Sequence, residues 1–220
     1  TISAVDAPAH DIIIRNNIFE YRDNGVSISY GSFYEIHIYN NLFKAYLQDP
    51  PWGAAVAIYN FDSMGYFTVL NNLMIDCHCQ YRRIDSSNGI VDYNLIWYSD
   101  GPACGGVPGL QANELLADPQ FVFYDGEQGG NYHLREGSPA IDAGTDISSL
   151  LSDYDGHPRS VNGRMDIGPY EYDSGACVPT TCAQEGWVCG QLADGCSDTL
   201  SCGECIPPDL CENGQCVTPG

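Results

Sequence analysis

Basic side chains are scarce in this chain of 220 residues: eight lysines and arginines stand against 29 acidic residues, and Lys44 is the only lysine. The formal net charge of −21 at pH 7 repels phosphate backbones and anionic membrane surfaces. The sequence also lacks any apolar run long enough to span a membrane. We therefore expect no nucleic-acid partner and no membrane insertion.

Cysteine is abundant and unevenly placed. Of eleven cysteines, eight fall within the last 44 residues, from Cys177 onward. Such a density is typical of proteins that fold in an oxidising compartment and is rare in the cytosol. The sequence thus predicts a secreted, extracellular or cell-surface protein with two parts that are stabilised differently.

A short repeat occupies the first hundred residues. Four segments align on an asparagine flanked by apolar residues, and the aligned asparagines lie 24, 31 and 22 residues apart. The segments are Ile13–Phe19, His37–Phe43, Thr68–Met74 and, more loosely, Val91–Trp97. Short β-rich runs lie between them, and no helical period interrupts them. Repeats of this length cannot bury an apolar face alone, so successive coils must stack.

The recurrent asparagines predict a ladder of side-chain amides. In stacked coils, an amide at a tight bend can hydrogen-bond to the amides above and below it, which satisfies polar groups at a buried position. Ordinary turns at each asparagine pair are the alternative. The predicted ladder consists of Asn17, Asn41, Asn72 and Asn94.

Residues 11–98 resemble the right-handed parallel β-helix family, whose coils often carry such Asn-Asn-Ile/Leu-Phe segments. The resemblance implies an all-β solenoid. It does not assign an activity, because the fold hosts lyases, hydrolases, epimerases, adhesins and phage spikes. The repeat is already in progress at Asp11, so either further coils precede it or another molecule covers that end.

Residues 113–172 have a different sequence pattern, without the asparagine repeat. They contain Asp118-Pro119-x-Phe121, then a run from Leu134 to Gly144 that includes Gly-Ser-Pro-Ala-Ile-Asp, and then Asp153-x-Asp155-Gly156-x-x-Arg159 and Asp166-Ile-Gly-Pro-Tyr-Glu171. This pattern resembles the C-terminal region of secreted bacterial β-helix proteins, often found beside surface-anchoring signals. The resemblance implies that residues 113–172 form a C-terminal cap after β-helix coils over residues 1–112. The cysteine-rich residues 173–220 are expected to form a separate disulfide-rich module.

The carboxylates of residues 113–172 favour a structural network. Arg159 is a suitable partner for Asp142, Asp155 or Asp166, and the network would close the solenoid. A catalytic role for this cluster is the alternative. The Asp153-x-Asp155 turn could bind a calcium ion through its two carboxylates, although the full EF-hand pattern is absent. No other cofactor is expected.

The tail lacks the aliphatic residues for a core, so crosslinks must hold it. The eight cysteines allow up to four disulfides with undetermined pairing. They are Cys177, Cys182, Cys189, Cys196, Cys202, Cys205, Cys211 and Cys216. Zinc is the alternative, but only one C-x2-C pair is present. The tail resembles small cysteine-rich modules of large secreted bacterial proteins, and its Trp187 is either a miniature core or a sugar platform.

Three cysteines remain: Cys77, Cys79 and Cys104. We expect a crosslink between adjacent coils with Cys104 as one partner. One thiol is then left over, and it could stay buried, pair with the tail or bridge to another copy.

Two classes of function follow. The chain is expected to be a structural or adhesive protein that binds polysaccharide or self-associates, with end-to-end assembly into a fibre as one form. The alternative is a polysaccharide lyase or glycoside hydrolase, or a carbohydrate-binding appendage of one, which needs paired carboxylates or a base on neighbouring strands. Its weak catalytic candidates are Arg82, Arg83, Asp85 and Asp92, and their spacing matches no known signature. Of the two classes, we expect the structural or adhesive protein rather than the enzyme.

Overall fold

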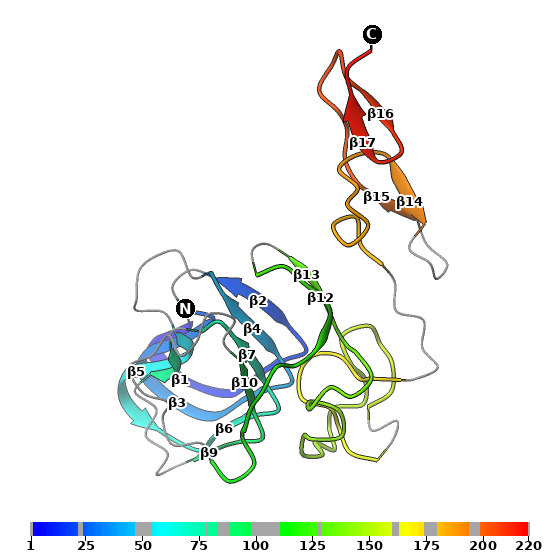
Figure 1. Cartoon of the computed structure of the whole chain (residues 1–220). Helices are drawn as coiled ribbons and strands as arrows, with labels where there is room; N and C mark the ends of the chain where they lie inside the picture. The colour runs from blue at the N-terminus through cyan, green and yellow to red at the C-terminus, as the bar shows by residue number, and fades with distance from the viewer. Residues whose placement is uncertain are drawn as a thin grey trace. The chain divides into compact units, whose positions relative to one another are not determined.

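A computed structural model of the chain describes residues 2–21, 24–46, 54–77, 79–82, 89–97, 111–126, 129–159, 163–173, 180–193 and 199–219. Every regular element in these ranges is a β-strand, so the described protein is all-β (Figure 1). Within these ranges no helix is long and apolar enough to cross a membrane. The chain divides into two compact units, residues 1–120 with 134–172 and residues 121–133 with 173–220, which we describe separately.

The first unit contains two sheets in which every pair of strands is parallel. The strands are β1 (Ile2–Arg15), β2 (Ile18–Tyr21), β3 (Val26–Tyr39), β4 (Leu42–Ala45), β5 (Ala54–Met64), β6 (Phe67–Leu70), β7 (Leu73–Ile75), β8 (Cys79–Arg82), β9 (Gly89–Asp92), β10 (Leu95–Trp97) and β11 (Leu115–Leu116). One sheet has the order β8-β5-β3-β6-β9, with β1 also on β3, and the other has the order β11-β10-β7-β4-β2. Equivalent positions of successive repeats are therefore neighbours across the strands.

The chain passes from one sheet to the other at each asparagine pair. The first asparagine of the pair has a positive φ, +50° at Asn16, +53° at Asn40 and +55° at Asn71, and Tyr93 takes this position in the fourth repeat with +55°. Asparagine tolerates this left-handed conformation better than most residues. The local preference of one residue type thus places a sharp bend at the same point of each repeat.

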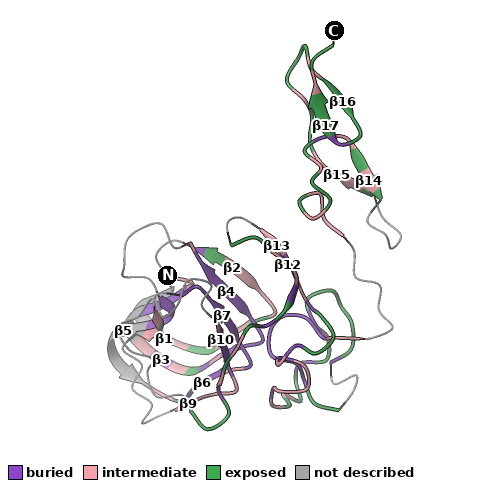
Figure 2. Ribbon diagram, viewed as in Figure 1, coloured by how far each residue is buried: buried purple, intermediate pink, exposed green. Residues whose placement is uncertain are grey.

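One buried apolar cluster contains residues from both sheets, and Figure 2 shows buried stretches in the strands of each. Ile28, Phe33, Ile38, Phe43 and Val69 are fully buried there. Burial of such side chains contributes about 1.5–3 kcal/mol each. The two sheets of the first unit are therefore held together chiefly by stacked apolar side chains.

Lys44 in β4 is also fully buried. Its ammonium nitrogen lies 4.7 Å from the centroid of the Tyr46 ring. This contact provides a cation–π interaction for a charge that has left the solvent.

We call residues 135–172 the flank segment. Its described residues, 135–159 and 163–172, have almost no regular structure and pack against the side of the strands. Leu150 and Met165 of this segment form a small buried cluster with Tyr39 of β3, and Ile147 packs against it. The segment therefore covers the surface near the asparagine bends.

The second unit contains three two-stranded sheets. They are β12 (Phe121–Tyr124) with β13 (Gly130–Leu134), β14 (Gln191–Ala193) with β15 (Thr199–Ser201), and β16 (Leu210–Glu212) with β17 (Gln215–Val217). The last two pairs are antiparallel. In the tail, a Cβ on Gly214 would clash with the Trp187 ring, so this ring packs closely on the β16–β17 turn. Trp187 thus fits the miniature-core interpretation.

Candidate functional site

The side chains of the four predicted ladder asparagines are joined in one continuous row. Each Nδ2 donates to the Oδ1 of the next asparagine, at 3.0 Å from Asn17 to Asn41, from Asn41 to Asn72 and from Asn72 to Asn94. Each of these accepting Oδ1 atoms also receives the backbone N–H of the preceding asparagine, at 3.1, 3.0 and 2.9 Å. The last three side chains are fully buried. Their polar groups are therefore satisfied inside the stack.

A carboxylate ends the ladder. Glu114 Oε1 accepts from Asn94 Nδ2 at 3.2 Å and from the Tyr81 hydroxyl at 2.6 Å, and Glu114 Oε2 accepts from the Gln111 N–H at 3.0 Å. Burial, and then the neighbouring carboxylate of Glu114, raise the pKa of Tyr81 well above its usual value, so its hydroxyl stays protonated and donates. Sequence analysis missed Glu114, because the repeat supplies no asparagine at this position.

The first asparagine of each pair points outward and binds the flank segment. Its amide hydrogen bonds to that segment are Asn16 Nδ2 to Ser152 O at 2.7 Å, Asn40 Nδ2 to Asp166 O at 3.0 Å and to Gly168 O at 3.1 Å, and Asn71 Nδ2 to Thr145 O at 2.8 Å. The Thr145 N–H donates back to Asn71 Oδ1 at 2.8 Å. Asn71 Nδ2 also donates to Asn40 Oδ1 at 3.2 Å. The second asparagine of each pair therefore joins the coils, and the first fastens the flank segment across three of them, with one further bond between coils at Asn40 and Asn71.

Arg159 is the centre of the flank network, but its acidic partner differs from the predicted ones. It forms a salt bridge with Glu171 at 3.2 Å, not with Asp142, Asp155 or Asp166. Its guanidinium also donates to Asn16 Oδ1 at 2.8 Å and to three backbone carbonyls, those of residues 168, 169 and 170. Burial lowers the pKa of Arg159, and the carboxylate of Glu171 opposes that shift. The spacing of the acidic residues could not show which of them faces the arginine.

Asp166 and Asp142 hold the backbone of the flank segment together. Asp166 accepts from the N–H groups of Asp142 at 2.8 Å and of Tyr172 at 2.5 Å. Asp142 Oδ1 accepts from the Arg164 N–H at 3.2 Å. Burial raises the pKa of Asp166 to about 7, and the hydrogen bond from Asp142 partly offsets this. Both residues are therefore engaged with backbone groups.

The carboxylate of Asp153, one of the two calcium candidates, also accepts hydrogen bonds from backbone amides. Asp153 accepts from the N–H groups of Asp155 at 2.9 Å, His157 at 2.8 Å and Glu171 at 3.0 Å. These three donors occupy most of the acceptor sites of one carboxylate. Asp155 is exposed. The arrangement accounts for Asp153 as a residue that orders its own loop.

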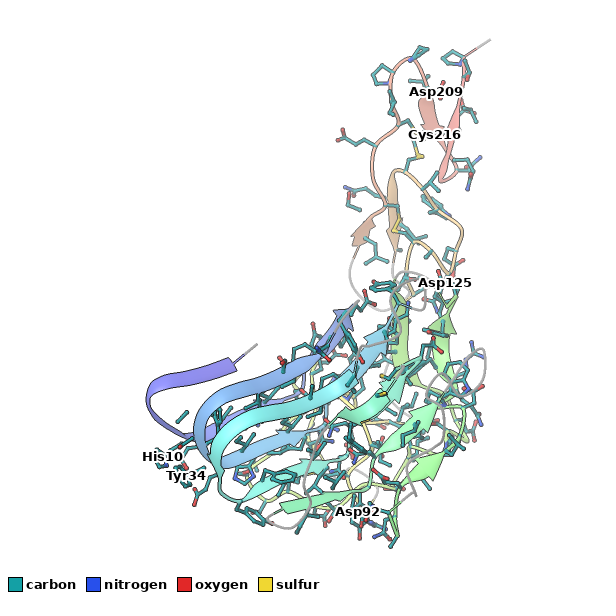
Figure 3. All side chains as sticks on the ribbon, turned by 90° about the vertical axis from the view of Figure 1, so that its left-hand side faces the viewer. His10, Tyr34, Asp92, Asp125, Asp209 and Cys216 are labelled. Carbon is teal, nitrogen blue, oxygen red and sulfur yellow. A yellow bond between two sulfur atoms is a disulfide. The ribbon has the colours of Figure 1, made fainter. Side chains whose placement is uncertain are left out.

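The weak catalytic candidates are only partly within the described residues. Arg83 and Asp85 lie outside them, and for Arg82 only the backbone in β8 is described. Asp92, labelled in Figure 3, accepts from the N–H and the Nδ2 of Asn113 at 2.9 and 2.8 Å. Asp92 Oδ1 also accepts from the Tyr93 N–H at 2.9 Å. The described contacts of Asp92 therefore order the bend at Tyr93 and the turn before β11.

Cys77 and Cys79 are both free thiols, which corrects the predicted disulfide at these positions. Cys77 is fully buried, and its sulfur accepts a hydrogen bond from the Tyr21 hydroxyl at 3.0 Å. Burial raises the pKa of Cys77 to about 12, so the thiol stays protonated and unreactive at neutral pH. Cys104, its predicted partner, lies outside the described residues.

Six tail cysteines form three disulfides: Cys182–Cys202, Cys189–Cys211 and Cys205–Cys216. Cys177 and Cys196 lie outside the described residues. The sulfurs of Cys189, Cys205 and Cys216 lie within 4.8 Å of one another. Since each is already in a disulfide, none is a thiolate that could bind zinc. The crosslinks are typical of an oxidising environment.

A row of aligned side chains crosses β1, β3, β6 and β9, with exposed residues on β1 and β9 and with the half-buried His37 and the buried Thr68 between them. The strand register aligns Ile13, His37, Thr68 and Ile90, and we call these four residues with Tyr66 the outer row. Ile13, Ile90 and Tyr66 are 53%, 48% and 46% exposed. The His37 ring meets the Tyr66 ring edge-on at 6.4 Å and its Nδ1 lies 2.9 Å from Thr68 Oγ1. This surface combines apolar, aromatic and polar groups that could contact a ligand.

A second aromatic pair lies on β1 and β3. His10 and Tyr34 stack with 5.0 Å between ring centroids, and Figure 3 shows them side by side.

A scan of models of known protein families and a search of curated proteins find no match to the chain. The interpretation of its function therefore depends on the geometry described above.

Proposed function

We propose that the chain is a secreted or cell-surface structural protein whose first unit is a right-handed parallel β-helix. Successive repeats pair in parallel in two sheets, and the asparagine bends recur with separations of 24, 31 and 22 residues, which supports one coil per repeat. Crossovers between parallel strands are almost always right-handed. The disulfides and the resemblance to secreted bacterial β-helix proteins support the compartment.

We further propose an adhesive role, and the outer row is the observation that carries it. Ile13 on β1, Ile90 on β9 and Tyr66, which precedes β6, are each about half exposed, and they lie in one row with His37. Exposed apolar residues that gather in one place on a surface mark candidate ligand sites. Sugar rings pack their apolar faces on such side chains, while hydroxyl and imidazole groups bind sugar hydroxyls. The charge of −21 disfavours anionic polymers. We therefore expect a neutral polysaccharide as the ligand.

Co-sedimentation with insoluble cellulose and chitin tests this role. The purified chain should bind one of these polymers, and Tyr66→Ala should lower the bound fraction several-fold. The matched control is Tyr154→Ala, because Tyr154 in the flank segment is 51% exposed but lies outside the outer row. Absence of binding, or equal binding by the two variants, would contradict adhesion through the outer row. Release of soluble sugar from the polymers would instead favour the enzyme.

A further inference from the structure

The ladder has two chemically different ends. At three positions, Oδ1 accepts two N–H groups from the preceding repeat, one from the backbone and one from the side chain. At the first position, Asn17 donates its amide to Arg15 O and to Asn41 Oδ1. Its own Oδ1 accepts no hydrogen bond within the described part of the chain. The Oδ1 of Asn17 therefore accepts no N–H group within the described residues, whereas the Oδ1 atoms of the other three ladder asparagines each accept two.

The apolar side chains beside Asn17 are incompletely covered. Ile12, Ile14, Ile18 and Phe19 are half-buried, whereas the residues aligned with them in the second repeat are at most 1% exposed. The reason is that β1 pairs only with β3 and β2 pairs only with β4 among the described strands. The ring of Phe19 stacks on Phe43 at 5.0 Å. We call Asn17 and these four apolar residues the end face.

We propose that the end face binds a further polypeptide coil of the repeat found in this chain, with asparagine at the ladder position. The end face has the same composition as the coil–coil interfaces within the first unit. It offers an amide acceptor flanked by apolar residues and the unpaired edges of two parallel strands. Edges of this kind bind an added strand through main-chain hydrogen bonds. The inference rests on the β-helix part of the proposed function.

The direction of the ladder determines what the occupant must supply. Asn17 Oδ1 needs N–H donors, and the opposite end of the ladder presents the carboxylate of Glu114, which only accepts. Stacking the far end of a second copy on the end face would therefore place two acceptors together. Two end faces in contact would do the same. This chemistry disfavours a fibre built by continuing the ladder from copy to copy, and it favours a coil that brings an amide.

A peptide from the chain itself tests the proposal. A fluorescently labelled peptide of residues 35–46, which contains Asn40, Asn41 and the apolar residues around them, should bind the full chain in an anisotropy titration. The same peptide with Asn41→Leu keeps the size and charge of the side chain but lacks the donor, and it should bind about tenfold more weakly. Equal affinity of the two peptides, or no binding of either, would overturn the proposal.

Variants of the full chain locate the binding surface. Asn17→Leu removes the acceptor, so it should weaken binding of the asparagine peptide and abolish the difference between the two peptides. The control is Asn113→Leu, since Asn113 is exposed and lies at the Glu114 end of the ladder. Discrimination that persists in Asn17→Leu would overturn the assignment to the end face. A negative result here leaves the polysaccharide experiment unaffected, so the two proposals fail separately.

Discussion

Replacing Asn72 by leucine should destabilise the first unit by about 3 kcal/mol. The Asn72 amide donates to Ile38 O, Leu70 O and Asn94 Oδ1, and its Oδ1 accepts from the backbone N–H and the Nδ2 of Asn41. Leucine has a similar size and none of these groups. The buried Asn41 backbone N–H would lose its only acceptor, which costs about 1–3 kcal/mol, and the remaining lost bonds add about 0.5–1.5 kcal/mol each, reduced by local relaxation. Asn17→Leu leaves no buried donor orphaned and should cost only about 1 kcal/mol.

Urea unfolding and hydrogen exchange check this difference. The free energy of unfolding of the first unit should fall more for Asn72→Leu than for Asn17→Leu, at an unchanged dependence on urea. Exchange of the Asn41 amide should accelerate strongly in Asn72→Leu and little in Asn17→Leu, because only the first substitution removes its acceptor. Equal costs for the two variants, or an Asn41 amide that stays protected in Asn72→Leu, would refute the view that the ladder stabilises by satisfying buried backbone groups.

Three further outcomes are expected. Arg159→Ala should lower the free energy of unfolding by about 3–5 kcal/mol in thermal melts, since it removes the arginine that forms a salt bridge with the buried carboxylate of Glu171. Arg159→Lys should recover only part of the lost stability in the same melts. Full recovery would contradict the role of the guanidinium group, which donates several hydrogen bonds at once. The pKa of the Asp166 carboxyl rises to about 7 on folding, so the protonated carboxyl stabilises the folded chain fully below pH 4, and this stabilisation is lost as the pH rises through 7. The melting temperature of the wild type should therefore exceed that of Asp166→Asn by less and less across that range. A constant difference would argue against the shift. Cys77, with its pKa raised to about 12, should resist iodoacetamide at pH 8 in the native chain and react after denaturation, as mass spectrometry would show.

The ladder could be predicted because its signal is local and repeated. Asn41 and Asn72 each follow a residue of the same type and precede an apolar pair, so a single alignment places both on the same side of the stack. The end of the ladder could not be predicted in this way. Glu114 breaks the pattern, and its role depends on which residue happens to lie one rung beyond Asn94.

The flank segment shows a second limit of sequence reasoning. Its motifs indicated a structural network around Arg159, and the described contacts are structural. The position of the segment beside Asn16, Asn40 and Asn71 depends on contacts that join residues from 74 to 143 positions apart in the sequence. No periodicity encodes such contacts. Residue types therefore predicted the kind of network but not its place on the molecule.

The burial of Lys44 has a practical consequence for handling the protein. Since this is the only lysine and its side chain is fully enclosed, reagents that acylate primary amines find no lysine on the native surface. A protease that cleaves only after lysine likewise has one target, and that peptide bond lies inside β4. Cleavage at Lys44 would therefore require the sheet around β4 to open, which makes a lysine-specific protease a reporter of unfolding in the first unit.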